Sequence, residues 1–281
     1  MKLLRYGDAG AEKWGMLDAE KRIRTLDDAL VNVTGDVLSP GWLSQLQQIF
    51  PEKLPLLKTE RRVGACVPRP LNFIGIGLNY ADHAAETGGK IPKEPILFLK
   101  SLSSFSGPYD DIIIPAGSTS TDWEVELGVV IGTLAKNVSE EDALEYVAGY
   151  CVVNDVSERE YQTKRGGQWD KGKGCDSFGP VGPYLVSKDE IPDPQNLSLW
   201  TEIDGVRRQD GTTANMIFGV KTLVSYVSQF ITLYPGDIIA TGTPAGVGMG
   251  IKPEPVFLRP GQEVRMGVQG LGEQRAKTVG G

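Results

Sequence analysis

Three carboxylates lie beside apolar segments of this 281-residue chain, where they could bind a divalent cation. Glu124 and Glu126 are two residues apart in the segment DWEVELGVVIG, so on a strand both would point to the same face. Asp155 follows the apolar segment GYCVVN. Paired carboxylates alone are most simply a solvated strand face, whereas with a cation they become ligands. Oxygen ligands alone would suit Mg²⁺ or Mn²⁺ and argue against Zn²⁺ or Cu²⁺.

His83 is the only histidine in the sequence, which excludes metal centres that need several imidazoles. The spacing predicts a short helix over 79–87, with Asn79 as its N-cap and Gly88-Gly89 as its stop. His83 and Glu86 would share a face of this helix, where the carboxylate would raise the basicity of the imidazole. The pair is either a general base on a mobile lid or an ordinary exposed ion pair.

Two further segments could hold an anionic ligand. In the cationic, glycine-rich segment 159–178, Arg159 and Gln162 follow Asp155 at about one helical turn each, and Lys173 stands between glycines. Segment 234–250 is an apolar strand followed by a TGTPAG turn, in which Thr243 and exposed amides could hold a carboxylate. A solvated loop and a simple turn are the alternatives.

The elements that must position these groups are mostly strands. The pattern of apolar residues along the chain predicts an α+β protein with antiparallel or mixed strands. Strands are expected at 95–99, 111–114, 122–132, 145–154, 182–186, 197–204, 237–241 and 263–269. Helices are expected at 79–87, 139–147, 155–163 and 217–231. Before them, 2–6 and 14–18 predict two strands, and 26–30 with 40–49 predict small helices. The segment VPRP at 67–70 suggests a small N-terminal domain at 1–67 and a larger domain at 68–281.

The composition and the N-terminal segment indicate which binding partners and which cellular compartment to expect. A net charge of −7 disfavours nucleic acid and anionic membranes. Three cysteines without a C-x-x-C spacing predict neither a disulfide framework nor a zinc site. The N-terminus lacks a signal-peptide pattern, and no apolar run of about 18 residues occurs, so a cytoplasmic protein that does not enter the membrane is expected.

Five motifs in order resemble the small bacterial branch of the fumarylacetoacetate hydrolase family: NYADHAAE, DWEVELGVVIG, NDVSEREYQ, KGKGCDSFGPVGP and TGTPAGVG. The resemblance covers the chain from about Leu71 onward. It implies the family's mixed β-roll beside a small N-terminal α/β domain, and a homodimer. It also implies a Mg²⁺ or Mn²⁺ site at Glu124, Glu126 and Asp155. His83, Glu86 and Lys173 would be catalytic, and the substrate would contact Arg159, Gln162, Thr243 and Tyr80.

The resemblance implies a metal-dependent hydrolase that cleaves a C–C bond of a small 2,4-diketo acid, giving pyruvate and an acid. Leu78 replaces the arginine of a GRNY motif found in acylpyruvate-cleaving relatives, which argues against a simple acylpyruvate and favours a 2,4-diketo-3-deoxy sugar acid. The alternatives are oxaloacetate decarboxylation, isomerisation of a 2-hydroxy-dienoate, a ureidoglycolate lyase and a non-catalytic binding protein on the same fold.

Overall fold

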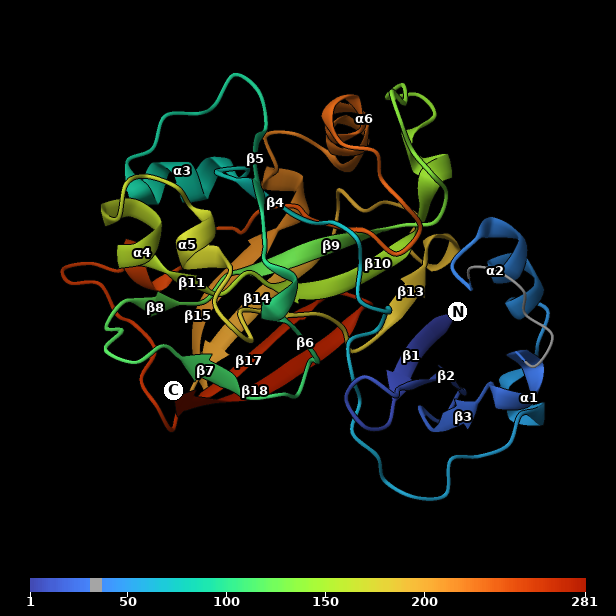
Figure 1. Cartoon of the computed structure of the whole chain (residues 1–281). Coiled ribbons are helices and arrows are strands. Elements are labelled where there is room, and N and C mark those ends of the chain that lie inside the picture. Colours follow the sequence, from blue (N-terminus) through green and yellow to red (C-terminus); the bar gives the residue numbers. More distant parts are fainter. Residues whose placement is uncertain (31–36) are drawn as a thin grey trace.

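The computed structural model describes residues 1–30 and 37–281, which form two large sheets with short helices around them (Figure 1). The nine-stranded sheet contains β1 (Lys2–Tyr6), β2 (Lys13–Leu17), β3 (Ile23–Thr25), β4 (Phe73–Gly77), β5 (Ile96–Leu99), β9 (Val125–Ile131), β10 (Val147–Asn154), β13 (Leu185–Ser187) and β16 (Ile238–Ala240). Its spatial order is β3-β2-β1-β13-β10-β9-β16-β4-β5. Because β16 pairs antiparallel with β9 and parallel with β4, the sheet is mixed.

The five-stranded sheet has the order β15-β14-β17-β18-β7. Its strands are β7 (Ile112–Ile114), β14 (Ser198–Ile203), β15 (Val206–Thr212), β17 (Glu263–Val268) and β18 (Gly272–Gly280). Two small pairs complete the strands, β6 (Phe105–Ser106) with β12 (Gly179–Pro180) and β8 (Thr121–Asp122) with β11 (Ser157–Glu158). The predicted α+β class with mixed strands is confirmed.

The helices are short. They are α1 (Asp27–Leu30), α2 (Pro40–Leu46), α3 (Ala81–Thr87), α4 (Arg159–Lys164), α5 (Asp170–Lys173) and α6 (Val220–Phe230). The 3₁₀ turns are η1 (Pro51–Lys53), η2 (Leu102–Ser104), η3 (Ala143–Tyr146), η4 (Lys188–Glu190), η5 (Thr213–Asn215) and η6 (Gly248–Gly250). Within residues 1–30 and 37–281, no helix has the length and apolar character needed to cross a membrane.

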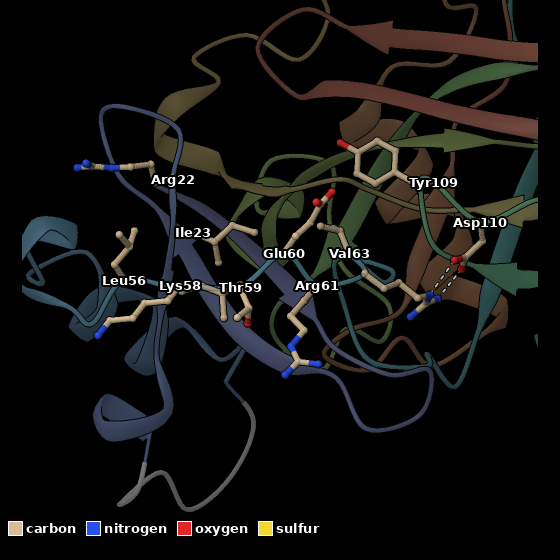
Figure 2. A pocket seen from close by; sticks show the side chains of 12 residues that line it. Arg22, Ile23, Leu56, Lys58, Thr59, Glu60, Arg61, Val63, Tyr109 and Asp110 are labelled. Atoms are coloured by element: carbon tan, nitrogen blue, oxygen red, sulfur yellow. Dashed lines mark hydrogen bonds and ion pairs between the residues drawn. The ribbon is translucent and has the colours of Figure 1, made fainter.

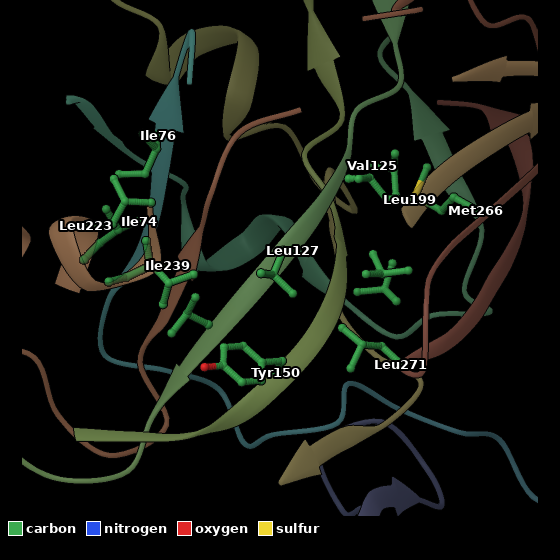
Figure 3. Close-up of a cluster of buried hydrophobic side chains, with 14 of the residues drawn as sticks. Ile74, Ile76, Val125, Leu127, Tyr150, Leu199, Leu223, Ile239, Met266 and Leu271 are labelled. Atoms are coloured by element: carbon green, nitrogen blue, oxygen red, sulfur yellow. The ribbon is translucent and has the colours of Figure 1, made fainter. Parts of the chain in front are cut away.

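Strand β9 is buried along its whole length because its two faces contribute to different hydrophobic clusters. Leu127 belongs to a first core, which also contains Leu199 and Met266 of the five-stranded sheet (Figure 3). Val130 points the other way, into a second core shared with Leu3 near the N-terminus. Successive side chains of β9 point alternately into the two cores, so both faces of this central strand are buried. The strand is therefore a rigid support for the residues at its start.

The N-terminal region joins the large sheet directly. Strand β1 pairs antiparallel with β13, so that Lys2 faces Val186 and Leu3 faces Leu185. The second core likewise combines Met16 from this region with Phe73 and Val153 from beyond residue 68. Residues on both sides of the predicted boundary thus share one sheet and one core.

Several local predictions need correction. Only η3 forms within the predicted helix 139–147, and β10 begins at Val147, where its apolar residues pair with β9. The predicted helix 155–163 is split into β11 and α4, because Ser157 and Glu158 pair with β8. Asn79 is not the N-cap of α3, which Tyr80 occupies without a side-chain bond. The Asn79 amide instead donates to the carbonyls of Phe218 and Thr241.

Candidate active site

A small cavity of about 120 Å³ gathers most of the residues that the sequence singled out. Seven of them line it: His83, Glu124, Glu126, Arg159, Gln162, Lys173 and Thr243. Asp155 and Glu86 lie immediately behind this lining and contact Lys173 and His83, respectively. Residues separated by more than 150 positions in the sequence therefore meet at one place.

The acidic cluster is built where β9 begins and β10 ends. The two strands pair antiparallel, with Glu126 opposite Val153, and the Asp155 amide donates to the Glu124 carbonyl at 2.9 Å. One carboxylate oxygen from each of Glu124, Glu126 and Asp155 lies within 4.8 Å of the others, and all three residues are buried. The solvated strand face is thus excluded for this pair of glutamates.

Three cations surround two of the carboxylates. Lys173 Nζ lies 2.7 Å from Glu124 Oε2 and 2.6 Å from Asp155 Oδ2, and Arg159 Nη2 lies 2.6 Å from Glu124 Oε1. Lys100 Nζ donates to Asp155 Oδ1 at 2.5 Å and to the Lys173 carbonyl at 2.6 Å. Burial alone would lower the pKa of Lys173, but Asp155 and Glu124 raise it above its usual value. The site therefore keeps a charged ammonium group on its wall.

Glu126 has a different environment. Burial, together with the nearby charges of Asp155 and Glu124, raises the pKa of Glu126 well above its usual range. The Gly242 amide donates to Glu126 Oε2 at 2.8 Å, but no lysine or arginine of the described chain forms an ion pair with this carboxylate. A buried carboxylate with two acidic neighbours and no cation of its own fits a divalent-cation ligand, since oxygen donors suit Mg²⁺ or Mn²⁺.

Helix α3 presents the imidazole beside this cluster. His83 Nδ1 lies 3.0 Å from Glu86 Oε1, and the Gly246 amide donates to both oxygens of Glu86 at 2.9 and 3.0 Å. An ionised carboxylate only accepts, so this contact assigns the Nδ1 proton to the imidazole and leaves Nε2 as the basic nitrogen. The helix ends at Gly88, whose φ of 69° is left-handed. His83 and Glu86 thus form the pair expected from their spacing.

The turn at 246–250, which holds Glu86, is itself held by β8 and the residue after it. Asp122 Oδ1 accepts from the Gly248 amide at 2.6 Å, and Asp122 Oδ2 accepts from the Met249 amide at 3.0 Å. Asp122 Oδ2 also accepts from Arg159 Nε at 2.8 Å, while Trp123 Nε1 donates to the Gly246 carbonyl at 3.1 Å. One buried carboxylate therefore links the arginine of the acidic cluster to the turn behind the imidazole.

Lys100 and Asp122 were not singled out by sequence reasoning. The signal for Lys100 was a lone lysine directly after the apolar strand segment ILFL, and Asp122 precedes Glu124 in the same motif. Gln162 Oε1 accepts from Arg159 Nη1 at 3.1 Å, and Thr243 Oγ1 donates to the Val125 carbonyl at 2.9 Å.

Tyr80 stands apart from the other predicted substrate-binding residues. It is fully buried in the first core and does not line the cavity. Its hydroxyl has no hydrogen-bond partner within the part of the chain that the structure describes. Tyr80 is the N-cap residue of α3, and its side chain belongs to the first core.

A larger cavity of about 940 Å³ lies between the N-terminal region and the loop at Tyr109 and Asp110 (Figure 2). Arg62 Nε donates to Asp110 Oδ1 at 2.7 Å on its wall. Its lining includes exposed Lys58 and Arg61 but neither a histidine nor a cysteine. Size alone does not make it a reaction site, and the smaller cavity holds the residues suited to acid–base chemistry.

Comparison with known proteins shows the family to which the chain belongs. Residues 72–279 match the family model described as the C-terminal domain of fumarylacetoacetate (FAA) hydrolase. The chain is therefore an enzyme of the fumarylacetoacetate hydrolase family. A curated relative from Burkholderia ambifaria, named "Putative hydrolase", is 63% identical over 278 residues and covers 99% of both chains.

Solved structures show the same fold. A fumarylacetoacetate hydrolase from Exiguobacterium antarcticum is 35% identical, with a TM-score of 0.85 and full coverage of both chains. A probable 2-hydroxyhepta-2,4-diene-1,7-dioate isomerase from Mycobacterium abscessus is 31% identical, with a TM-score of 0.82 and coverage of 100% and 99%. A maleylpyruvate hydrolase from Sphingobium sp. SYK-6, in complex with manganese(II) and pyruvate, is 26% identical, with a TM-score of 0.80 and full coverage of both.

Proposed function

We propose that this enzyme is a Mg²⁺- or Mn²⁺-dependent hydrolase that cleaves the C3–C4 bond of a small 2,4-diketo acid, giving pyruvate and a second acid. The observation that carries the proposal is that His83, backed by Glu86, lines the same small cavity as Glu124 and Glu126 of the acidic cluster. In this proposal the general base shares one cavity with the cation ligands. The pyruvate and manganese(II) named with the maleylpyruvate hydrolase structure support the same chemistry.

In the proposed reaction, Glu124, Glu126 and Asp155 would hold the cation, which supplies Lewis-acid stabilisation of developing negative charge when bound. His83 Nε2 would accept a proton from water as the water oxygen bonds to C4. The C3–C4 bond then breaks, its electrons pass to C3 as an enolate, and a proton at C3 gives pyruvate. Lys173 would add positive charge near the substrate's carboxylate. General-base help of this kind is worth about 10²–10⁴-fold.

Two measurements test the proposal. Mg²⁺ or Mn²⁺ should raise the melting temperature of the wild-type enzyme, and oxalate should raise it further because it resembles the chelating end of the substrate. Product analysis with 2,4-diketo acids, oxaloacetate, a 2-hydroxy-dienoate and ureidoglycolate should then show pyruvate from a diketo acid. No stabilisation by either metal, or turnover of only the other three compounds, would contradict the proposed hydrolase.

The role of His83 is tested separately by His83→Ala. No second histidine can replace it, so hydrolysis should fall by about 10²–10⁴-fold while stabilisation by Mn²⁺ persists. Full hydrolysis in this variant would rule out His83 as the base. If His83→Ala loses hydrolysis but retains oxaloacetate decarboxylation, His83 is needed to activate water and is not needed for the enolate chemistry.

The proposal includes a homodimer in the cytoplasm that acts on a small keto acid and binds neither nucleic acid nor membranes. Light scattering of the purified protein at several concentrations checks the dimer, and cell fractionation checks the location.

A further inference from the structure

Every carboxylate oxygen of two candidate cation ligands contacts a positively charged side chain of the protein. Glu124 Oε1 lies 2.6 Å from Arg159 Nη2, and Glu124 Oε2 lies 2.7 Å from Lys173 Nζ. Asp155 Oδ1 accepts from Lys100 Nζ at 2.5 Å, and Asp155 Oδ2 accepts from Lys173 Nζ at 2.6 Å. A divalent cation that binds both carboxylates must therefore share these oxygens with a buried side-chain cation or displace it.

Lys173 is the one of these three side chains that contacts both carboxylates. Its Nζ lies within 2.7 Å of an oxygen of Glu124 and within 2.6 Å of an oxygen of Asp155. Divalent cations bind carboxylate oxygens at about 2.0–2.6 Å, so the ammonium group holds nearly the position that a cation bridging these two oxygens would take. Two positive charges at one such position repel each other strongly.

The other two side-chain cations each have a second partner that is not a candidate ligand. Lys100 Nζ donates to the Lys173 carbonyl at 2.6 Å, and Arg159 Nε donates to Asp122 Oδ2 at 2.8 Å. Within the described chain, the hydrogen bonds of Lys173 Nζ go only to the two candidate ligands. A divalent cation would take over both of these partners, so Lys173 is the group that it would displace most readily.

The backbone of α5 is fixed, but the side chain of Lys173 has space to move. A Cβ atom on Gly172 would lie 2.4 Å from the Glu158 carbonyl oxygen, so α5 packs directly against the backbone at the start of α4. Lys173 lines the small cavity, and its Nζ lies 5.0 Å from the centroid of the Phe98 ring. Because an aromatic face attracts an ammonium group, rotation of the side chain alone could move Nζ toward Phe98 and the cavity.

We infer that the Lys173 ammonium group and a divalent cation exclude each other at Glu124 and Asp155. Lys173 neutralises the two carboxylates until the cation binds, and the bound cation moves the ammonium group into the cavity. The ammonium group then becomes available to the carboxylate of a substrate only after the cation is in place, so the cation binds before the substrate. This inference rests on the proposed function, because it requires that the acidic cluster binds Mg²⁺ or Mn²⁺.

The test is the affinity of Lys173→Met for Mn²⁺, measured by calorimetry on protein treated with EDTA. Exclusion predicts a dissociation constant at least about tenfold lower than that of the wild type, whereas loss of a group that merely supports the ligands should raise it by about 10–100-fold. The melting temperature of the EDTA-treated variant should fall, because two buried carboxylates lose a partner, and Mn²⁺ should restore it. An unchanged or higher dissociation constant would overturn the inference.

Lys100→Met is the matched control. Lys100 is also a buried partner of Asp155, but it forms no ion pair with Glu124 within the described chain. Its replacement removes the same charge beside the acidic cluster, so we expect a smaller gain in affinity for Mn²⁺ than in Lys173→Met. An equal gain in both variants would assign the effect to net charge and refute the exclusion.

A crystal structure of the wild-type enzyme with Mg²⁺ decides the inference even if neither variant folds. Lys173 Nζ should lie more than about 3.5 Å from Glu124 Oε2 or from Asp155 Oδ2, beyond hydrogen-bond distance. Retention of both contacts beside a bound cation would refute the exclusion and leave the proposed function intact. If Mn²⁺ and Mg²⁺ bind neither the wild type nor the variants, the proposed function fails and this inference fails with it.

Discussion

Replacing Asp122 by Asn should weaken the link between Arg159 of the acidic cluster and the turn at 246–250, which holds Glu86. The carboxylate accepts four bonds, from Arg159 Nε and from the amides of Trp123, Gly248 and Met249. The Asn side chain keeps one oxygen and places an NH₂ group against two donors, so two bonds to a buried charge are lost. At about 1.5–3 kcal/mol each, the free energy of unfolding should fall by about 3–6 kcal/mol. Urea unfolding at constant pH measures this loss.

The same substitution should reduce turnover although Asp122 does not line the cavity. Loosening the turn at 246–250 releases the Gly246 amide from Glu86, and the imidazole then loses its fixed orientation. Loss of such supporting contacts typically costs about 10–100-fold, which we expect in kcat at saturating Mn²⁺. If Asp122→Asn has the same stability and the same kcat as the wild-type enzyme, this reasoning is refuted.

Asp110→Asn is the matched control for Asp122→Asn. Asp110 likewise binds an arginine, Arg62, and accepts from the Gly107 amide at 2.7 Å, but its side chain is 27% exposed and does not line the small cavity. We expect a smaller loss of stability than for Asp122→Asn and an unchanged kcat, because this ion pair is partly exposed to solvent. A similar fall in kcat for both variants would show that the effect of Asp122 is only general destabilisation.

Three further substitutions test the charges. Lys100→Met should lower the free energy of unfolding by about 3–5 kcal/mol in urea, since it removes one of the two buried lysines that pair with Asp155; an unchanged midpoint would contradict this. Glu126→Gln should abolish the rise in melting temperature with Mn²⁺ without lowering the stability of the metal-free protein, because burial and its acidic neighbours already disfavour the charged form. Burial would raise the pKa of Asp18, but the Arg22 amide and the Arg24 side chain lower it to about 2. Asp18→Asn should therefore lower the melting temperature at neutral pH, and the difference from wild type should shrink as pH falls from about 4 to about 2. A difference that stays constant would refute the assignment.

The acidic cluster was predictable from sequence because its geometry is local to two strands. Glu124 and Glu126 flank one residue, and Asp155 follows directly on the partner strand, so pairing of β9 with β10 suffices to join them. The imidazole pair was also predictable, since a spacing of three residues on a helix brings side chains together. The contacts lie within one helix in the second case and between two paired strands in the first, so a short sequence pattern suffices to predict them.

Contacts between distant segments could not be predicted in this way. Lys100 follows β5 and Asp155 follows β10, and three strands lie between β5 and β10 in the sheet, so no local sequence pattern predicts the contact of Lys100 with Asp155. Asn79 has the residue type of an N-cap, yet the carbonyls of Phe218 and Thr241 bind its amide, and no local pattern reports those partners. Tertiary contacts overrode the local preference at both positions.

The pairing of β1 with β13 makes the folding unit larger than the segment that the family model matches. The family model begins at residue 72, but β13 has β10 on one side and the N-terminal strand on the other. A protein expressed from residue 72 onward would expose the free edge of β13 and half of the second core, which favours strand exchange between molecules. The first 67 residues thus protect the sheet against aggregation, and chimeras within the family should carry their own N-terminal strand.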